Sequence, residues 1–192
     1  MDSMRIIIVR LSALGDIINT APILYFIKQR HPDAMIDWVC EEAFAPILEG
    51  HPHLNKVHTV AIKRAKKEKS LSILLQTFKK LRTLGPYDKI IDLQGLVKSA
   101  LVARLIGKNV YGFAKDSIRE TIAAKFYAHH THIAYEENSI WRSMAIINDA
   151  LQTDITPNRL DQKPSALHYD AHDFHFDDLF TKDKKNIAFI LG

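Results

Sequence analysis

Hydrophobic residues in the first part of the chain form short continuous runs, and longer stretches with helical spacing lie between these runs. A short apolar run bounded by turn residues is typical of a buried strand, whereas apolar residues at every third or fourth position predict an amphipathic helix. The runs predict strands at residues 5–9, 35–40, 57–62, 89–93 and 109–113, and a weaker sixth strand at residues 132–135.

The stretches between the strands predict helices at residues 17–29, 44–49, 96–106 and 117–128. Pro22 should kink or restart the first helix, because proline cannot donate the helical hydrogen bond. Two further helices carry apolar stripes: Leu71, Leu74, Leu75, Phe78 and Leu81 in one, and Ile140, Met144, Ile147 and Leu151 in the last. Regular alternation of strand and helix predicts an α/β fold, a Rossmann-like doubly wound parallel sheet.

The loops that follow the strands are where a ligand site is expected. In doubly wound sheets, ligands bind beyond the carboxyl ends of the strands. This rule brings five distant segments to one edge of the predicted sheet: residues 11–16, 41–42, 63–69, 94–95 and 114–116.

Composition narrows the class of protein without naming a partner. The 192 residues are 47% hydrophobic and 25% charged, which is ordinary for a globular chain. A net charge of +4 favours an anionic partner. Cys40 is the only cysteine, and neither a signal peptide nor a membrane-spanning run is present. A cytoplasmic protein that could still bind a membrane surface is therefore expected.

The C-terminal part of the chain has a different character. Residues 1–151 form the predicted domain, and residues 152–185, rich in Pro, Asp, His and Lys, read as a connector. Residues 186–192 form a new apolar run that leads into a glycine, similar to the first strand and its loop. They predict the first strand of a second α/β domain. The alternative is that this strand joins the sheet of the first domain.

Gly15 and Asp16 stand where the first strand gives way to a helix. The dinucleotide fingerprint and the P-loop are both absent, so a nucleotide is not expected to bind to the residues present here. Gly15 should let the backbone turn tightly. Asp16 could cap the helix, or it could act as a general base at the mouth of a cleft. The pattern alone leaves both interpretations open.

A basic run, KRAKKEK, covers residues 63–69. Such a run is often a solvated helix face, but here it follows the third strand on the predicted ligand edge. Lysine and arginine together suit phosphates or sugar carboxylates. Nucleic acid is not expected, since no aromatic residues are interleaved for base stacking. The histidines match no zinc spacing, and Asp92 is expected to be a structural or edge acid.

Five segments in order and at matching spacing carry a resemblance to a known family: RIIIVRLSALGDIINTAP, IDWVCEEAFAPI, VAIKRAKKE, YDKIIDLQGLVKSA and IRETIAAKFYAHHTHIA. Over residues 4–151 the chain resembles the N-terminal domain of the lipopolysaccharide heptosyltransferases of glycosyltransferase family 9. The WVCEEAF and DLQGLVKSA blocks are more similar to type I than to type II enzymes.

The resemblance implies roles for individual residues. Asp16 matches the family's proposed catalytic base. Ser12 and Gly15 would shape the catalytic loop. Acceptor binding is implied for a basic cluster and for weaker candidates on the same edge: Lys63, Arg64, Lys66 and Lys67, then Asp116, Ser117 and Arg119. Ala65 stands where a relative has an aromatic residue, which puts an aromatic contact to the acceptor in doubt.

The resemblance also implies a GT-B architecture of two Rossmann-like domains and an inverting transfer of L-glycero-D-manno-heptose. ADP-heptose would be the donor and Kdo2-lipid A the acceptor, with no essential metal or other cofactor. The enzyme would lie at the cytoplasmic face of the inner membrane of a Gram-negative bacterium. Donor-binding residues are expected after Gly192, so the 192-residue chain alone is expected to be inactive. The alternatives are a later core acceptor, or a non-catalytic basic module that binds an anionic membrane or nucleic acid.

Overall fold

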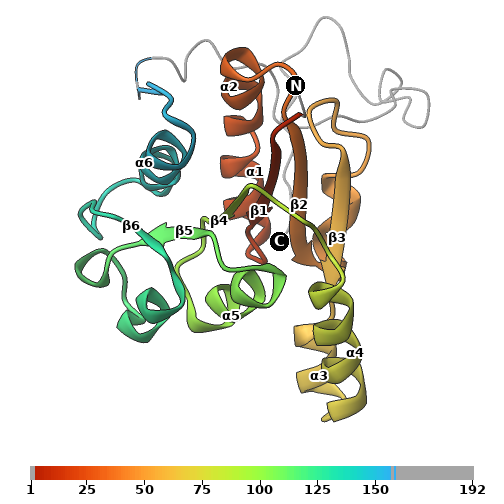
Figure 1. Cartoon of the computed structure of the whole chain (residues 1–192). Coiled ribbons are helices and arrows are strands. Elements are labelled where there is room, and N and C mark those ends of the chain that lie inside the picture. Colours follow the sequence, from red (N-terminus) through yellow and green to blue (C-terminus); the bar gives the residue numbers. More distant parts are fainter. Residues whose placement is uncertain (1–2, 157, 159–192) are drawn as a thin grey trace, which may run out of the picture.

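A computed structural model describes residues 3–156 and 158 of the chain. Its centre is a six-stranded sheet in the order β3-β2-β1-β4-β5-β6 (Figure 1). Every pair of neighbouring strands is parallel. The strands are β1 Arg5–Val9, β2 Met35–Glu41, β3 Lys56–Val60, β4 Lys89–Asp92, β5 Val110–Phe113 and β6 His129–Thr131. The predicted Rossmann-like parallel sheet is confirmed.

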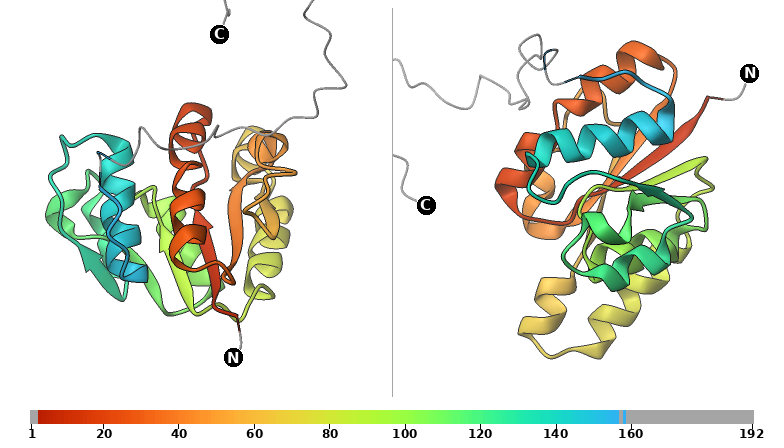
Figure 2. Two further views of the ribbon diagram at one scale, coloured as in Figure 1. Left: turned by 90° about the horizontal axis from the view of Figure 1, so that it is seen from above. Right: turned by 90° about the vertical axis from the view of Figure 1, so that its left-hand side faces the viewer.

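Helices cover both faces of the sheet, as Figure 2 shows. On one face lie α1 Leu14–Thr20, α2 Ile23–Arg30 and α6 Ser139–Leu151. On the other lie α4 Leu71–Arg82, α5 Val97–Ile106 and the 3-10 helix η3 Thr121–Phe126. Strands covered on both sides are mostly apolar, and Ile6, Ile7 and Ile8 of β1 are completely buried.

Three shorter elements follow strands and complete the C-terminal edge of the sheet. These are the 3-10 helix η1 Glu42–Ile47, α3 Ile62–Lys67 and the 3-10 helix η2 Lys115–Ser117. The strand order reverses between β1 and β4, which is the switch point where such sheets bind ligands. The loops after β1 and β4 therefore meet at the position where a site is expected.

Two predicted elements were wrong in type or place. Residues 117–128 contain the last residue of η2 and all of η3 rather than one helix, and the sixth strand is His129–Thr131 instead of residues 132–135. Side-chain hydrogen bonds explain the interruption. Arg142 donates to the Ser117 carbonyl at 2.7 Å, and Tyr127 donates to Asp92 at 2.8 Å. Both ends of the segment are held by distant partners, so a straight helix cannot satisfy them.

The predicted apolar stripe of α4 is also partly wrong. Leu81 is buried as expected, but Leu71 and Leu75 are 76% and 67% exposed. α3 and α4 form a hairpin that extends past the C-terminal edge of the sheet (Figures 1 and 2). The first turns of α4 lie beyond the layer against which they could pack.

The kink at Pro22 is confirmed, since α1 ends at Thr20 and α2 begins at Ile23. None of the helices in the described part of the chain is long and apolar enough to cross a membrane. Most of the predicted connector (152–185) and all of the predicted second-domain strand (186–192) lie outside the described residues.

Candidate functional site

Asp16 lies at the switch point, as the third residue of α1. Its Oδ1 is 3.2 Å from Nη2 of Arg10, and its Oδ2 accepts the Ala13 backbone N–H at 3.1 Å. Its side chain is still 43% exposed. Asp16 therefore caps its own helix and also presents a fixed carboxylate to the space beyond the sheet. The two interpretations left open by the sequence are compatible.

Arg10 forms an ion pair with this carboxylate from the protein interior. Its guanidinium is buried and donates to the Leu93 carbonyl, while Nε has no hydrogen-bond partner within the described residues. Burial lowers the pKa of Arg10, and the nearby charges of Asp16 and Asp92 oppose that shift. The Arg10 guanidinium therefore lies beside the Asp16 carboxylate and fixes its position.

Two residues that sequence reasoning did not assign complete the loop. Gln94 accepts the Leu11 backbone N–H at 2.9 Å and donates to the Ser12 hydroxyl at 3.3 Å. Lys98, in the first turn of α5, donates to the same hydroxyl at 3.3 Å. Ser12 is buried and so shapes the loop from inside. The QGLVK segment within DLQGLVKSA was the available signal for both residues.

Asp92 is the structural support of this arrangement. It is completely buried and accepts hydrogen bonds from the backbone of Gln94 and Gly95, and from the hydroxyls of Ser99 and Tyr127. Burial raises its pKa despite these bonds. The expectation of a structural acid is confirmed, because Asp92 fixes the turn that presents Gln94.

Gly15 differs from its expected role. It is not among the glycines with positive φ, and it lies inside α1. A Cβ atom built there would meet nothing within 4 Å. The tight-turn explanation was therefore wrong. The absent side chain instead leaves open space beside Asp16.

The basic run lies on α3, anchored to the end of β2. The buried Glu41 carboxylate accepts the Lys63 backbone N–H, with 3.2 Å to each oxygen. Burial raises the pKa of Glu41, and this hydrogen bond opposes the shift. The Lys63 ammonium lies 4.6 Å from the centre of the Phe44 ring. An aromatic residue is thus present beside the basic helix, supplied by η1, whereas Ala65 is buried.

The other cations of α3 are exposed. Arg64 pairs with Glu42 through Nε at 2.7 Å and Nη2 at 3.2 Å, and this hydrogen bond raises the pKa of Arg64. Lys66 and Lys67 are exposed and form no ion pair within the described residues. α3 therefore presents two uncompensated ammonium groups and one partly neutralised guanidinium.

The weaker candidates after β5 divide into two kinds. Ser117 is buried: its hydroxyl donates to Asp116 at 3.2 Å and accepts the Ile133 backbone N–H at 3.0 Å. Asp116 and Arg119 are exposed. A hydrogen bond from His132 lowers the pKa of Asp116. Ser117 thus stabilises the loop by hydrogen bonds, while Asp116 and Arg119 are exposed to solvent.

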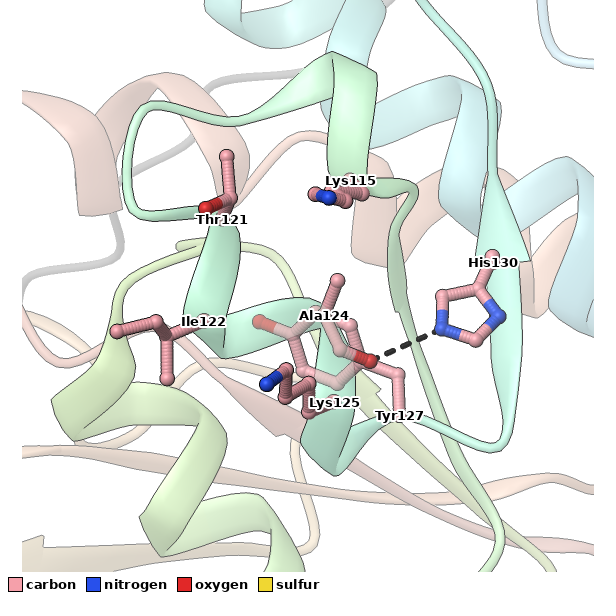
Figure 3. A pocket seen from close by; sticks show the side chains of 7 residues that line it. All are labelled: Lys115, Thr121, Ile122, Ala124, Lys125, Tyr127 and His130. Atoms are coloured by element: carbon pink, nitrogen blue, oxygen red, sulfur yellow. Dashed lines mark hydrogen bonds between the residues drawn. The ribbon is translucent and has the colours of Figure 1, made fainter.

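A pocket of about 430 Å³ lies elsewhere, beside η3 and β6 (Figure 3). Lys115, Lys125 and His130 line it, and His130 Nε2 is 2.9 Å from the Ala124 carbonyl oxygen. None of the predicted site residues lines this pocket. Concavity alone therefore does not identify the edge that carries Asp16.

The described residues contain no group of three or more histidine, cysteine, aspartate or glutamate side chains that could hold a metal ion. The expectation of metal-free chemistry stays a prediction.

Residues 74–192 match the family model "Glycosyltransferase family 9 (heptosyltransferase)". This match covers more than half of the chain. The chain belongs to glycosyltransferase family 9. The resemblance seen in the sequence motifs is confirmed.

Curated family 9 members include proteins similar to this chain. Lipopolysaccharide heptosyltransferase 1 of Campylobacter coli is 38% identical over 195 residues, covering 98% of this chain and 55% of the relative. The protein of that name from Escherichia coli K12 is 36% identical over 152 residues, covering 77% and 48%. The chain spans about half the length of these relatives.

A solved structure gives the same picture. The E. coli heptosyltransferase WaaC with ADP-2-deoxy-2-fluoro heptose superimposes with a TM-score of 0.73 at 34% identity. The match covers 80% of this chain and 50% of WaaC. The described domain therefore has the fold of half of a family 9 enzyme.

Proposed function

We propose that these residues form the acceptor-binding half of an inverting heptosyltransferase in lipopolysaccharide inner-core synthesis. The donor is ADP-L-glycero-D-manno-heptose and the acceptor is Kdo2-lipid A. The similarity to type 1 enzymes at 35–38% identity, against 28–30% for type 3, supports this acceptor over a later one.

The observation that carries the proposal is the fixed, half-exposed carboxylate of Asp16 at the switch point. In the reaction, a Kdo hydroxyl oxygen attacks the anomeric carbon of the donor. The bond from that carbon to the ADP oxygen breaks, and ADP leaves with the electron pair. Asp16 accepts the hydroxyl proton as the new bond forms. Attack opposite to the leaving group inverts the anomeric configuration.

The remaining candidates bind and position the acceptor. Lys63, Arg64, Lys66 and Lys67 supply positive charge for Kdo carboxylates and lipid A phosphates. Arg119 and Asp116 extend this edge beyond β5, while Ser12, Gly15 and Ser117 define its shape. Lys98 joins them, because its ammonium lies beside the Ser12 hydroxyl next to the Asp16 loop.

The setting of the reaction belongs to the same proposal. The donor-binding residues are supplied from outside the described domain, in a GT-B arrangement. A carboxylate base and an ADP leaving group need no metal at the attacking oxygen. An acceptor anchored in a bilayer places the enzyme at the cytoplasmic face of a Gram-negative inner membrane.

The test uses a full-length protein in which the C-terminal part of the Campylobacter coli relative follows residue 192. Asp16→Asn keeps the shape of the side chain but removes the base. We expect kcat for heptose transfer to fall by about 10²–10⁴-fold with a small change in the acceptor KM. Asp33→Asn, an exposed carboxylate in the turn before β2, is the matched control and should keep full turnover.

Two further arms examine the substrate assignments. Kdo2-lipid A should be used in preference to an already heptosylated core, and EDTA should leave the rate unchanged. Turnover that survives Asp16→Asn would refute the catalytic role. Measurable transfer by the 192-residue chain alone would show that its own residues suffice for the donor.

A further inference from the structure

The tip of the α3–α4 hairpin combines exposed apolar residues with positive charge. Leu71 and Leu75 lie one turn apart on α4 and are 76% and 67% exposed, the two highest values among the exposed large apolar side chains of the described residues. Adjacent leucines exposed to this degree are costly in water, and a contiguous apolar patch commonly marks an interaction surface.

The cations around these leucines are exposed as well. Lys66 and Lys67 end α3, Lys69 lies in the turn, and Lys79 and Arg82 follow on α4. On a helix, positions 71, 75, 79 and 82 lie along one side. Glu68 is the acidic residue of the turn. The hairpin therefore has an exposed apolar tip that is surrounded by positively charged side chains.

The hairpin is held firmly enough to present this surface. The Ser70 backbone N–H donates to the Ala65 carbonyl at 2.9 Å, and the Ser70 hydroxyl accepts from Ile73. Thr77 and Leu81 of α4 are buried on the opposite side from the leucines. Both Figures 1 and 2 show the hairpin extending past the sheet edge that carries Asp16.

We propose that Leu71, Leu75 and the surrounding lysines form a docking surface for an anionic lipid bilayer. Leucine side chains enter the boundary between headgroups and acyl chains, while the ammonium groups contact anionic headgroups. The inference rests on the proposed function only in that a lipid-linked acceptor gives such docking a purpose. Bilayer binding itself requires neither donor nor acceptor.

A second copy of the chain fits this surface less well. Two leucines per molecule cover far less than the roughly 1,200 Å² of a stable interface. Pairing two such tips would also bring two lysine clusters together, and like charges repel. Charge complementarity therefore favours the bilayer.

The test measures binding of the 192-residue chain to sedimented vesicles that contain no lipopolysaccharide. Vesicles of phosphatidylcholine mixed with phosphatidylglycerol should bind it, and vesicles of phosphatidylcholine alone should bind it much more weakly. Leu71→Ser with Leu75→Ser should lower the partition coefficient at least tenfold. Leu101→Ser with Ile122→Ser, exposed apolar residues elsewhere, is the matched control and should change little.

The charge arm uses Lys69→Gln with Lys79→Gln, because neither residue is assigned to the acceptor. Binding should fall by roughly 30-fold at low salt, and added salt should reduce the difference. Lys108→Gln with Lys125→Gln is its control. Exposed substitutions should leave the unfolding midpoint unchanged, so a loss of binding cannot be assigned to misfolding.

The outcomes separate the two proposals. Absent vesicle binding, or binding that the leucine pair does not affect, overturns the docking surface. A dimer that Leu71→Ser with Leu75→Ser dissociates would assign the face to a second copy instead. Vesicle binding with no heptose transfer by the full-length protein would leave the docking surface standing and refute the proposed function.

Discussion

Two carboxylates, one near the N-terminal ends of the strands and one beyond their C-terminal ends, have similar polar partners but different roles. Asp37, near the start of β2, is buried and accepts hydrogen bonds from Asn55, His58 and Tyr87. Asp16, just after β1, has one cation and one backbone N–H as partners and stays 43% exposed. Asp37 is buried with its oxygens hydrogen-bonded inside the protein, whereas the Asp16 carboxylate is accessible to a further partner.

This difference in accessibility distinguishes a structural carboxylate from one that can take part in chemistry, which residue type alone does not. A buried carboxylate with satisfied oxygens stabilises the fold, and approaching molecules cannot reach it. A carboxylate that is fixed but accessible can exchange a proton with something outside the protein. Asp92 sharpens the contrast, because it lies at the same edge as Asp16 and yet is as closed as Asp37.

The largest effect on stability is expected from Asp92→Ala. It would leave the Gln94 and Gly95 N–H groups and the Tyr127 hydroxyl without this acceptor, while the Ser99 hydroxyl can still donate to the Leu96 carbonyl. We expect a loss of about 3–5 kcal/mol in the free energy of unfolding, measured by urea denaturation. Asp92→Asn keeps one acceptor oxygen and should cost clearly less. Equal costs would mean that hydrogen bonding is not what makes Asp92 structural.

A pH-dependent effect is expected at Asp37. Burial would raise its pKa, but the hydrogen bonds from His58, Tyr87 and Asn55 outweigh it and lower the pKa to about 2. As pH falls below about 4, the unfolded chain takes up this proton first. The stabilisation by Asp37, roughly 2 kcal/mol, is therefore present above about pH 4 and is lost as pH falls toward 2.

Asp37→Asn should remove this part of the acid sensitivity while leaving heptose transfer unchanged. Unfolding free energies of the wild type and the variant at pH 6 and pH 3 measure the difference. If the two proteins lose the same stability between these pH values, Asp37 is not the group responsible.

The smallest effect is expected at the exposed Arg64–Glu42 pair. Both side chains are partly in solvent, at 47% and 40%, and solvent screening leaves such pairs little effect on stability. Glu42→Gln should leave the unfolding midpoint nearly unchanged and free the Arg64 guanidinium. The acceptor KM should then fall slightly, and a rise would contradict the assignment of Arg64 to the acceptor.

Part of the candidate site could be predicted because its polar residues directly follow apolar runs in the sequence. Asp16 follows an apolar run directly, and the basic residues of α3 follow the third strand. Arg10, Gln94 and Lys98 were not assigned, since their roles depend on β1 and β4 being neighbours in space. A separation of 83 positions, as between Leu11 and Gln94, leaves no local periodic signal.

Local residue patterns were enough to predict the parallel α/β fold, its family and the position of Asp16, because apolar runs and motif order are properties of neighbouring residues. The packing of elements that are distant in the sequence sets which charged side chains are buried and which are exposed. It placed Arg10 under Asp16, enclosed Asp92 and left Leu71 and Leu75 outside the core. The physical reason is that burial depends on where the layers of the fold end, and the spacing of residues along a helix does not contain that boundary.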